Sequence, residues 1–150
     1  MTTESAVKEF MSQPALAVVG VSRNKNKFGS IVYRDLKGKG YRVYAVNPNA
    51  QMIDGDPAYP DLFSLPEAVG GVVLIVKPEV TERMVEQAKQ AGITRVWMQP
   101  GAESPAAAAY CEANGIAAVL GECIMMFAGP VRFPHTIHRW VNKVSGKLPK

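Results

Sequence analysis

The sequence has few cysteines, few aromatic residues and no long apolar run, and each shortage excludes a class of protein. The two cysteines, Cys111 and Cys123, lack the spacing of a metal site and are too few for a disulfide framework. Two reduced thiols are typical of a protein in a reducing compartment, so we expect the cytoplasm. No apolar run approaches the roughly 20 residues of a membrane helix, and no signal peptide is expected at the N-terminus.

The excess of positive charge is also small. The chain has 17 Lys and Arg against 13 Asp and Glu, for a net charge of +4, and these cations are mostly scattered. A nucleic-acid surface usually needs a basic stripe with exposed aromatic residues, so we expect no nucleic-acid partner. A mild excess of cations does suit a small anionic ligand.

The length of 150 residues suits one domain.

Short apolar runs rich in valine alternate with amphipathic stretches. Such runs are typical of parallel strands that are buried on both faces, with helices as the crossovers between them. The predicted strands are 15–20, 41–46, 71–76, 94–98 and 116–120. The predicted helices are 4–11, 28–37, 78–91 and 105–114. The sequence therefore predicts an α/β fold, a single Rossmann-like domain with a five-stranded parallel sheet and helices on both faces.

The segments outside this alternation are harder to interpret. Residues 49–70 are interrupted by prolines and aspartates, so we predict a loop with a short helical turn near 64–68. We take the domain core as about 13–122 and the rest, 123–150, as a C-terminal extension that could include a closing helix at 136–141. His135 and His138 have helical spacing but lack a third ligand, so no metal site is predicted.

The stretch between the first predicted strand and the next helix has the features of an anion site. Gly20-Val21-Ser22 ends the strand, and three cations, Arg23, Lys25 and Lys27, precede the helix. The first amides of a helix have no partner within the helix, and the helix dipole adds partial positive charge there. We expect phosphates at this loop. The alternative is a connecting loop whose cations are simply solvated.

The pattern differs from a dinucleotide site. That site needs G-x-G-x-x-G and an acidic residue after the second strand. Here Ser22 takes the place of the second glycine, the next glycine is Gly29, and Asn47-Pro48 follows the second strand. NAD is therefore disfavoured, whereas the loop cations suit a ligand with an extra phosphate, either NADP or coenzyme A.

Five short segments then occur in a specific order and spacing. They are Val19-Gly20-Val21-Ser22 with Lys27 and Gly29, Tyr41-Arg42-Val43 to Val46-Asn47-Pro48, Val76-Lys77-Pro78, Val96-Trp97-Met98-Gln99-Pro100-Gly101, and Gly121-Glu122-Cys123. Over roughly residues 10–125 the chain resembles the standalone CoA-binding domain proteins, relatives of the N-terminal domain of the succinyl-CoA synthetase alpha subunit. The resemblance implies coenzyme A or an acyl-CoA as the ligand.

The resemblance also implies which residues contact that ligand. In the loop, the implied contacts are Gly20, Val21, Ser22, Arg23, Lys25, Lys27, Phe28 and Gly29, with the cations at the diphosphate or the ribose 3′-phosphate. At the other strand ends, the implied contacts are Asn47 and Pro48 beside the adenosine, Lys77 and Pro78 at the cleft border, and Gln99 and Gly101 beside the pantetheine arm. Asn47-Pro48 could equally be a turn, and Lys77 a surface lysine.

The synthetase also needs a domain with a phosphorylated histidine and a nucleotide-grasping subunit, so we expect binding here without catalysis. The alternatives are a small NADP-dependent or acyl-CoA-handling enzyme, and a regulatory partner that senses its ligand. Cys123 would lie beside the cleft, but no group near it in the sequence is expected to activate the thiol. Whether the protein forms a homo-oligomer or binds a partner protein stays open.

Overall fold

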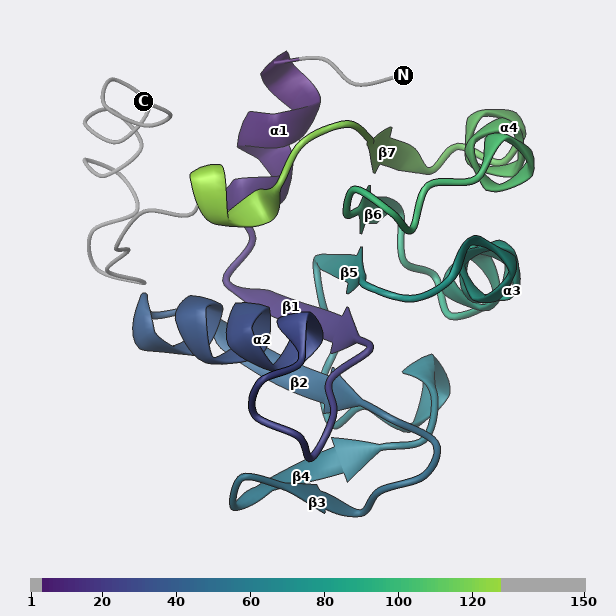
Figure 1. Ribbon diagram of the computed structural model, residues 1–150. Coiled ribbons are helices and arrows are strands. Elements are labelled where there is room, and N and C mark those ends of the chain that lie inside the picture. The colour runs from purple at the N-terminus through teal and green to yellow at the C-terminus, as the bar shows by residue number, and fades with distance from the viewer. Residues whose placement is uncertain (1–3, 128–150) are drawn as a thin grey trace.

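Seven strands form one sheet in the order β3-β4-β2-β1-β5-β6-β7 (Figure 1). The computed structural model describes residues 4–127. The strands are β1 Ala15–Val19, β2 Arg42–Val46, β3 Met52–Ile53, β4 Asp56–Tyr59, β5 Gly71–Leu74, β6 Arg95–Met98 and β7 Ala117–Val119. All neighbours pair in parallel except β3 and β4, which form an antiparallel hairpin.

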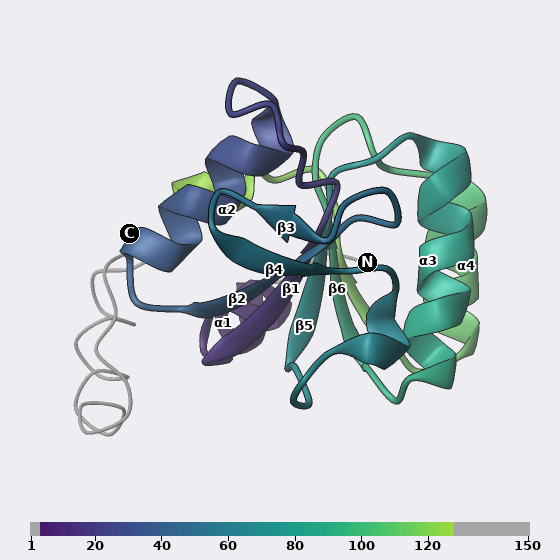
Figure 2. The ribbon, with the colours of Figure 1, turned by 90° about the horizontal axis from the view of Figure 1, so that it is seen from below.

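Helices cover both faces of the sheet, with α1 and α2 on one side and α3 and α4 on the other (Figure 2). The α-helices are α1 Glu4–Met11, α2 Phe28–Gly38, α3 Pro78–Gln90 and α4 Pro105–Ala113. Two short 3₁₀ helices are η1 Leu62–Ser64 and η2 Ile124–Met126. Among the described residues, no helix is long and apolar enough to cross a membrane.

The central strand β1 is buried along its whole length and supplies both cores. Leu16 and Val18 belong to the cluster under α1 and α2, whereas Ala15, Ala17 and Val19 belong to the cluster under α3 and α4. Successive side chains of a strand point to opposite faces, so a strand covered on both sides must be apolar at every position. This requirement explains the unbroken run of small and β-branched residues.

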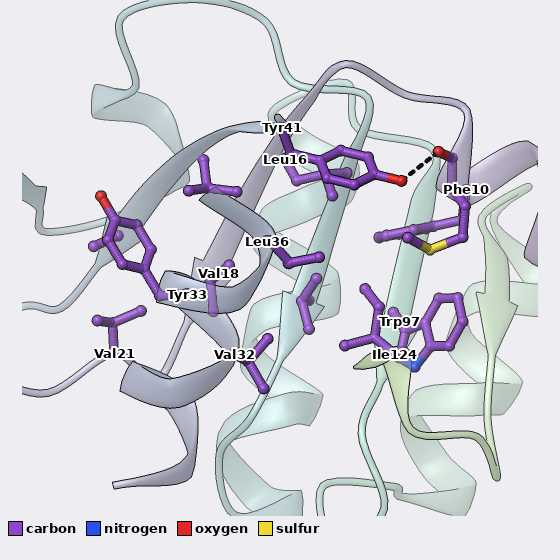
Figure 3. Close-up of a cluster of buried hydrophobic side chains, with 14 of the residues drawn as sticks. Phe10, Leu16, Val18, Val21, Val32, Tyr33, Leu36, Tyr41, Trp97 and Ile124 are labelled. Carbon is purple, nitrogen blue, oxygen red and sulfur yellow. Dashed lines mark hydrogen bonds between the residues drawn. The ribbon is translucent and has the colours of Figure 1, made fainter. Parts of the chain in front are cut away.

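The cluster on the α2 side joins the two ends of the described chain (Figure 3). Val32 and Leu36 of α2 pack above the sheet near Ile124 of η2, which is fully buried. Phe10 of α1 meets Trp97 of β6 edge-on, with ring centroids 5.3 Å apart. Trp97 is fully buried and is therefore a residue of this core.

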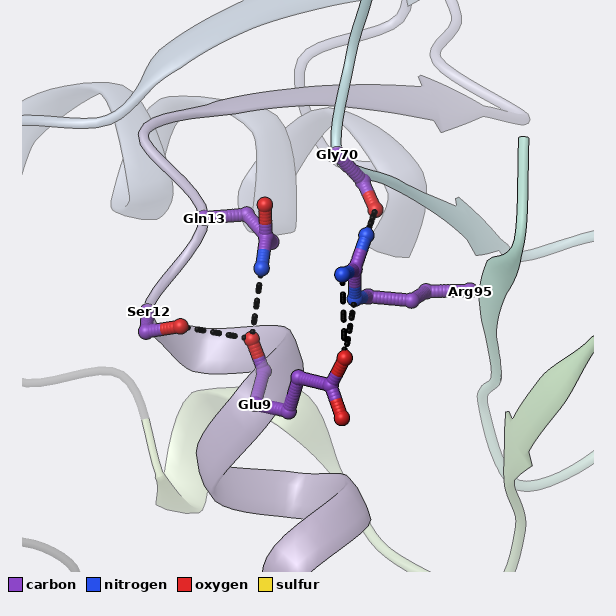
Figure 4. Close-up of polar contacts among 5 residues, drawn as sticks. All are labelled: Glu9, Ser12, Gln13, Gly70 and Arg95. Carbon is purple, nitrogen blue, oxygen red and sulfur yellow. Dashed lines mark hydrogen bonds and ion pairs between the residues drawn. The ribbon is translucent and has the colours of Figure 1, made fainter. Parts of the chain in front are cut away.

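Polar contacts hold α1 to the start of the sheet (Figure 4). The Arg95 guanidinium pairs with the Glu9 carboxylate at 2.9 Å and donates to the Gly70 carbonyl oxygen at 3.1 Å. The Tyr41 hydroxyl, which is buried, donates to the Met11 carbonyl oxygen at 2.8 Å. These contacts lie at the amino ends of the strands and leave the carboxyl edge free.

The α/β Rossmann-like architecture, the four helices and the five parallel strands are confirmed, although several strands are one or two residues shorter than predicted. The predicted total of five strands is wrong, because residues 52–59 form β3 and β4 rather than a loop. The helical turn expected near 64–68 lies earlier, at η1. The closing helix expected at 136–141 and both histidines lie outside the described residues.

Candidate functional site

The candidate site predicted from the sequence lies at the point where the order of the strands along the sheet changes direction. After β1 the chain forms β2 on one side of it and later returns to form β5 on the other side. In open α/β sheets, ligands bind outside the carboxyl ends of the strands at such a point. The residues that follow β1, β2 and β5 therefore define the candidate site.

Two glycines let the loop after β1 pack directly against backbone. Gly20 has a φ of +110°, and a Cβ there would lie 2.1 Å from the carbonyl oxygen of Ile75. A Cβ on Gly29, in the first turn of α2, would lie 2.1 Å from the carbonyl oxygen of Gly20. Both positions need the absence of a side chain, since a Cβ cannot approach so closely. The result is a helix N-terminus that touches the end of the central strand.

Hydrogen bonds fix the backbone of this loop. The Ser22 amide donates to the buried Ser30 hydroxyl at 3.1 Å, and that hydroxyl donates back to the Ser22 carbonyl oxygen at 2.7 Å. The Asn47 side-chain amide donates to the Val21 carbonyl oxygen at 2.9 Å. The Asn24 amide donates to the Ser22 hydroxyl oxygen at 2.9 Å. The loops after β1 and β2 are thus tied together before any ligand binds.

The N-terminus of α2 has no side-chain cap. Lys27 occupies the N-cap position and makes no capping hydrogen bond. Within residues 4–127 we find no hydrogen bond from the amides of Phe28 and Gly29. By contrast, Asp61 caps η1 and Ser104 caps α4. An uncapped helix start leaves its amides available to an anion.

The cations of the loop are equally available. Arg23, Lys25 and Lys27 are exposed, and none of them forms an ion pair with any residue between 4 and 127. They stand next to the partial positive charge of the helix start. The loop before the uncapped start of α2 therefore carries three exposed cations.

A groove of about 430 Å³ opens beside this loop, between the ends of the central strands and α3. Five of the predicted residues line it, namely Gly20, Val21, Ser22, Asn47 and Pro48. The wall of α3 was not predicted as part of the site, and it supplies Val80, Arg83, Met84 and Gln87. Their spacing of i, i+3, i+4 and i+7 marks one helix face, which is the signal that could have indicated them.

The wall of α3 contributes the only formal charge in the lining of this groove. Arg83 is exposed and has no ion-pair partner within the described chain. The Gln87 carboxamide oxygen accepts from the Leu62 amide at 2.7 Å, and within residues 4–127 we find no hydrogen bond from its NH₂ group. The groups left to bind a ligand are donors on an otherwise apolar surface.

The other predicted site residues lie elsewhere around the carboxyl edge of the sheet. Arg23 and Lys25 line a second, smaller cavity. Lys77 and Pro78 are exposed at the start of α3, where Lys77 makes no capping bond. Gly101 lies in an exposed turn with a φ of +97°. Lys27, Phe28 and Gly29 form the start of α2 and line neither cavity.

Gln99 is a predicted site residue with a polar side chain that is buried. It is 1% exposed, and its carboxamide oxygen accepts from the Ile124 amide at 2.6 Å. Its NH₂ group lies 3.5 Å from the Cys123 sulfur, and that cysteine is half-buried.

The other cysteine, Cys111, is buried, and burial raises the pKa of its thiol to about 11. Within residues 4–127 no cluster of three His, Cys, Asp or Glu could hold a metal.

Comparison with known proteins assigns the chain to a family. The family model described as the CoA binding domain matches residues 15–128. A conserved hypothetical protein from Pyrococcus furiosus is 39% identical, with a TM-score of 0.71 over 74% of this chain and 96% of that one. A hypothetical protein from Pyrococcus horikoshii is 31% identical, with a TM-score of 0.78 over 82% of this chain and 87% of that one.

A curated relative is the ADP-forming acetate–CoA ligase I of Archaeoglobus fulgidus. It is 33% identical over 72 residues, which are 48% of this chain and 10% of the ligase. This chain therefore corresponds to a small part of that enzyme. The prediction made from the five short segments is confirmed: the chain belongs to the CoA binding domain family.

Proposed function

We propose that this domain binds coenzyme A or an acyl-CoA, without catalysis of its own. The phosphates would contact the amides at the start of α2 and the cations Arg23, Lys25 and Lys27. The adenosine would lie in the groove between the strand ends and α3. The observation that carries the proposal is the uncapped start of α2, where Gly29 packs on Gly20 at the border of the groove and the neighbouring loop cations form no ion pair within residues 4–127.

The chemistry of the groove supports this arrangement. Its volume of about 430 Å³ lies within the range of about 300–1,000 Å³ for small-molecule sites. Valines, prolines and Met84 supply an apolar surface for a flat base, while Ser22, Arg83 and Gln87 supply donors. A purine presents ring nitrogens that accept hydrogen bonds, and a phosphate is an acceptor throughout.

The proposal covers ligand binding and not the ligase reaction. The alignments with the two Archaeoglobus fulgidus ligases include 10% and 13% of those enzymes. The amides, cations and apolar side chains of the site bind and orient a ligand. None of them is arranged with a second group as a nucleophile–base pair.

Isothermal titration with CoA tests the proposal. We expect saturable binding that weakens about tenfold in Lys27→Ala, because a charge-assisted contact to phosphate is lost. Lys8→Ala is the matched control, since Lys8 is an exposed lysine of α1 whose one ion pair within residues 4–127 is with Glu4, at 3.9 Å. Absence of binding at millimolar CoA would overturn the proposal, and tighter binding of NADPH than of CoA would favour the alternative of a small NADP-dependent enzyme.

A second experiment needs no chosen ligand. Protein purified gently and released into a mass spectrometer should carry CoA or an acyl-CoA, and the mass would identify the acyl group. Recovery of a different nucleotide in stoichiometric amount would contradict the proposal.

A further inference from the structure

Three large apolar side chains are exposed on one face of the domain, on α2 and on the short helix η2. Phe28 is 43% exposed and Ile31 is 37% exposed, and the two lie one turn apart on the same side of α2. Met126 of η2 is 77% exposed. Because η2 packs beside α2 on the same face of the sheet (Figures 1 and 2), we refer to these three residues as the α2–η2 patch.

The rest of α2 and η2 is packed as expected for elements at a core. Val32 and Leu36 on the inner side of α2 are fully buried, and so is Ile124 of η2. Directly after η2, the Phe127 ring packs against Trp97, with ring centroids 5.9 Å apart. The outer side of an amphipathic surface helix is usually polar. The apolar outer side of α2 therefore suits a surface that another segment covers.

The sequence that follows Phe127 has the matching pattern. Four apolar residues occur there at the helical spacing i, i+3, i+4 and i+7, namely Ile137, Trp140, Val141 and Val144. Basic residues fall on the other side of this pattern, namely Arg139, Lys143 and Lys147, and residues 128–150 contain no Asp or Glu. As a helix, such a segment would have an apolar side suited to the patch and a basic side suited to water.

The position and size of the patch favour a segment of the same chain as its occupant. The residues between Phe127 and Ile137 can span about 30 Å, and the patch begins at Met126 itself. A segment attached so closely is present at an effective concentration of about a millimolar. A stable dimer usually buries about 800 Å² on each partner, which is more than three side chains supply.

We propose that residues 137–144 dock on the α2–η2 patch, with their apolar side against Phe28, Ile31 and Met126. The basic side would then face solvent. Phe28 is the first residue of α2, so the docked segment would lie next to the start of that helix. The proposal needs no bound ligand, so it stands or falls independently of the proposed function.

Acrylamide quenching of tryptophan fluorescence in the full chain tests this docking. The chain has two tryptophans, and Trp97 is fully buried, so the emission that acrylamide can reach comes from Trp140. The variant Trp140→Phe gives the Trp97 emission to subtract. We expect a quenching constant for Trp140 that is severalfold lower than that of free tryptophan amide.

Substitutions in the patch should expose Trp140. Ile31→Asp and Met126→Asp should each raise its quenching constant severalfold, because a carboxylate would be buried under the docked segment. Met126 is so exposed that its substitution leaves the core intact, so this variant decides the matter even if Ile31→Asp fails to fold. Phe63→Asp, at an exposed aromatic residue of η1, is the matched control and should leave the quenching constant unchanged.

Three results would overturn the proposal. The first is a Trp140 that is quenched as readily as free tryptophan amide in the unaltered protein, or that stays shielded in Met126→Asp. The second is shielding that grows with protein concentration together with a dimer in size-exclusion chromatography, since the occupant would then be a second copy. The third is shielding that requires vesicles of phosphatidylglycerol and phosphatidylcholine, because a basic amphipathic segment can also bind an anionic membrane surface.

Discussion

Gly29 packs on the carbonyl oxygen of Gly20 so closely that a methyl group between them would lie 2.1 Å from that oxygen. The neighbour is backbone rather than the end of a flexible side chain, so the contact cannot be relieved by a rotamer change. The pair therefore fixes the start of α2 against the end of β1, and the geometry of the proposed phosphate site depends on it.

Gly29→Ala should push α2 away from β1 and weaken both folding and CoA binding. Overpacking of this kind costs about 1–3 kcal/mol of unfolding free energy, measurable by urea denaturation. Gly38→Ala is a matched control at the other end of the same helix, where a Cβ would meet nothing within 4 Å. It should stabilise the protein by up to about 1 kcal/mol. Unchanged CoA affinity in Gly29→Ala would show that the contact is not needed for the site.

Ser30→Ala should loosen the loop after β1. The Ser30 hydroxyl bonds both the amide and the carbonyl of Ser22, and its loss leaves two polar groups without their partner. We expect a loss of about 1–3 kcal/mol in unfolding free energy and faster hydrogen exchange at the Ser22 amide. Ser12→Ala removes an exposed hydroxyl that, among the described residues, bonds only the Glu9 carbonyl oxygen, and this substitution should change little. Equal effects of the two substitutions would contradict this role.

Gln99→Leu tests whether the Gln99 carboxamide has a structural role or reaches a ligand. The substitution leaves the buried Ile124 amide without its acceptor, so the unfolding free energy should fall by about 1–3 kcal/mol. Gln90→Leu, at an exposed position of α3, is the control. A variant with normal stability but weakened CoA binding would show that the carboxamide contacts the pantetheine arm, as the sequence prediction had it.

Glu67 should make stability depend on pH in acid. Its carboxylate accepts hydrogen bonds from Arg42 and Tyr44, and these lower its pKa from 4.5 to about 2. The folded carboxyl binds its proton less readily than the unfolded one, so its contribution is present above about pH 4.5 and is lost as the pH falls towards 2. Arg42 is 57% exposed, which keeps the effect below about 1 kcal/mol.

Glu67→Gln should remove this contribution, so the loss of unfolding free energy between pH 6 and pH 2 should be smaller than in the unaltered protein. Glu4→Gln, which removes a 3.9 Å surface ion pair with Lys8, serves as the control. A pH profile of Glu67→Gln that superimposes on the original would show that the bonds to Arg42 and Tyr44 do not contribute.

The parallel strands could be predicted because burial on both faces leaves a plain signal, as in the apolar run of β5. The hairpin could not, because β3 has two residues and too little length for any alternation. Pro57 and Gly55 indicate a turn, yet Pro57 is tolerated within β4, where the ladder to β2 runs through Ala58 and Tyr59.

The loop of the candidate site was visible in the sequence because its glycines and cations are close together. Arg83 was not, since it lies on the exposed face of an amphipathic helix and resembles any solvated arginine. Only the fold brings it beside the strand ends. For Gln99 the sequence reveals the position and not the orientation. Its place after β6 is evident from the sequence, but the direction of its side chain is not.

The sheet ends, within the described chain, in strands of two and three residues, β3 on one side and β7 on the other. Such short borders offer too few unpaired amides and carbonyls to template another strand. Self-association by continuation of the sheet is therefore disfavoured at both borders, which also lowers the tendency to form fibrils. Contacts between two copies of this domain would use helix surfaces or loops.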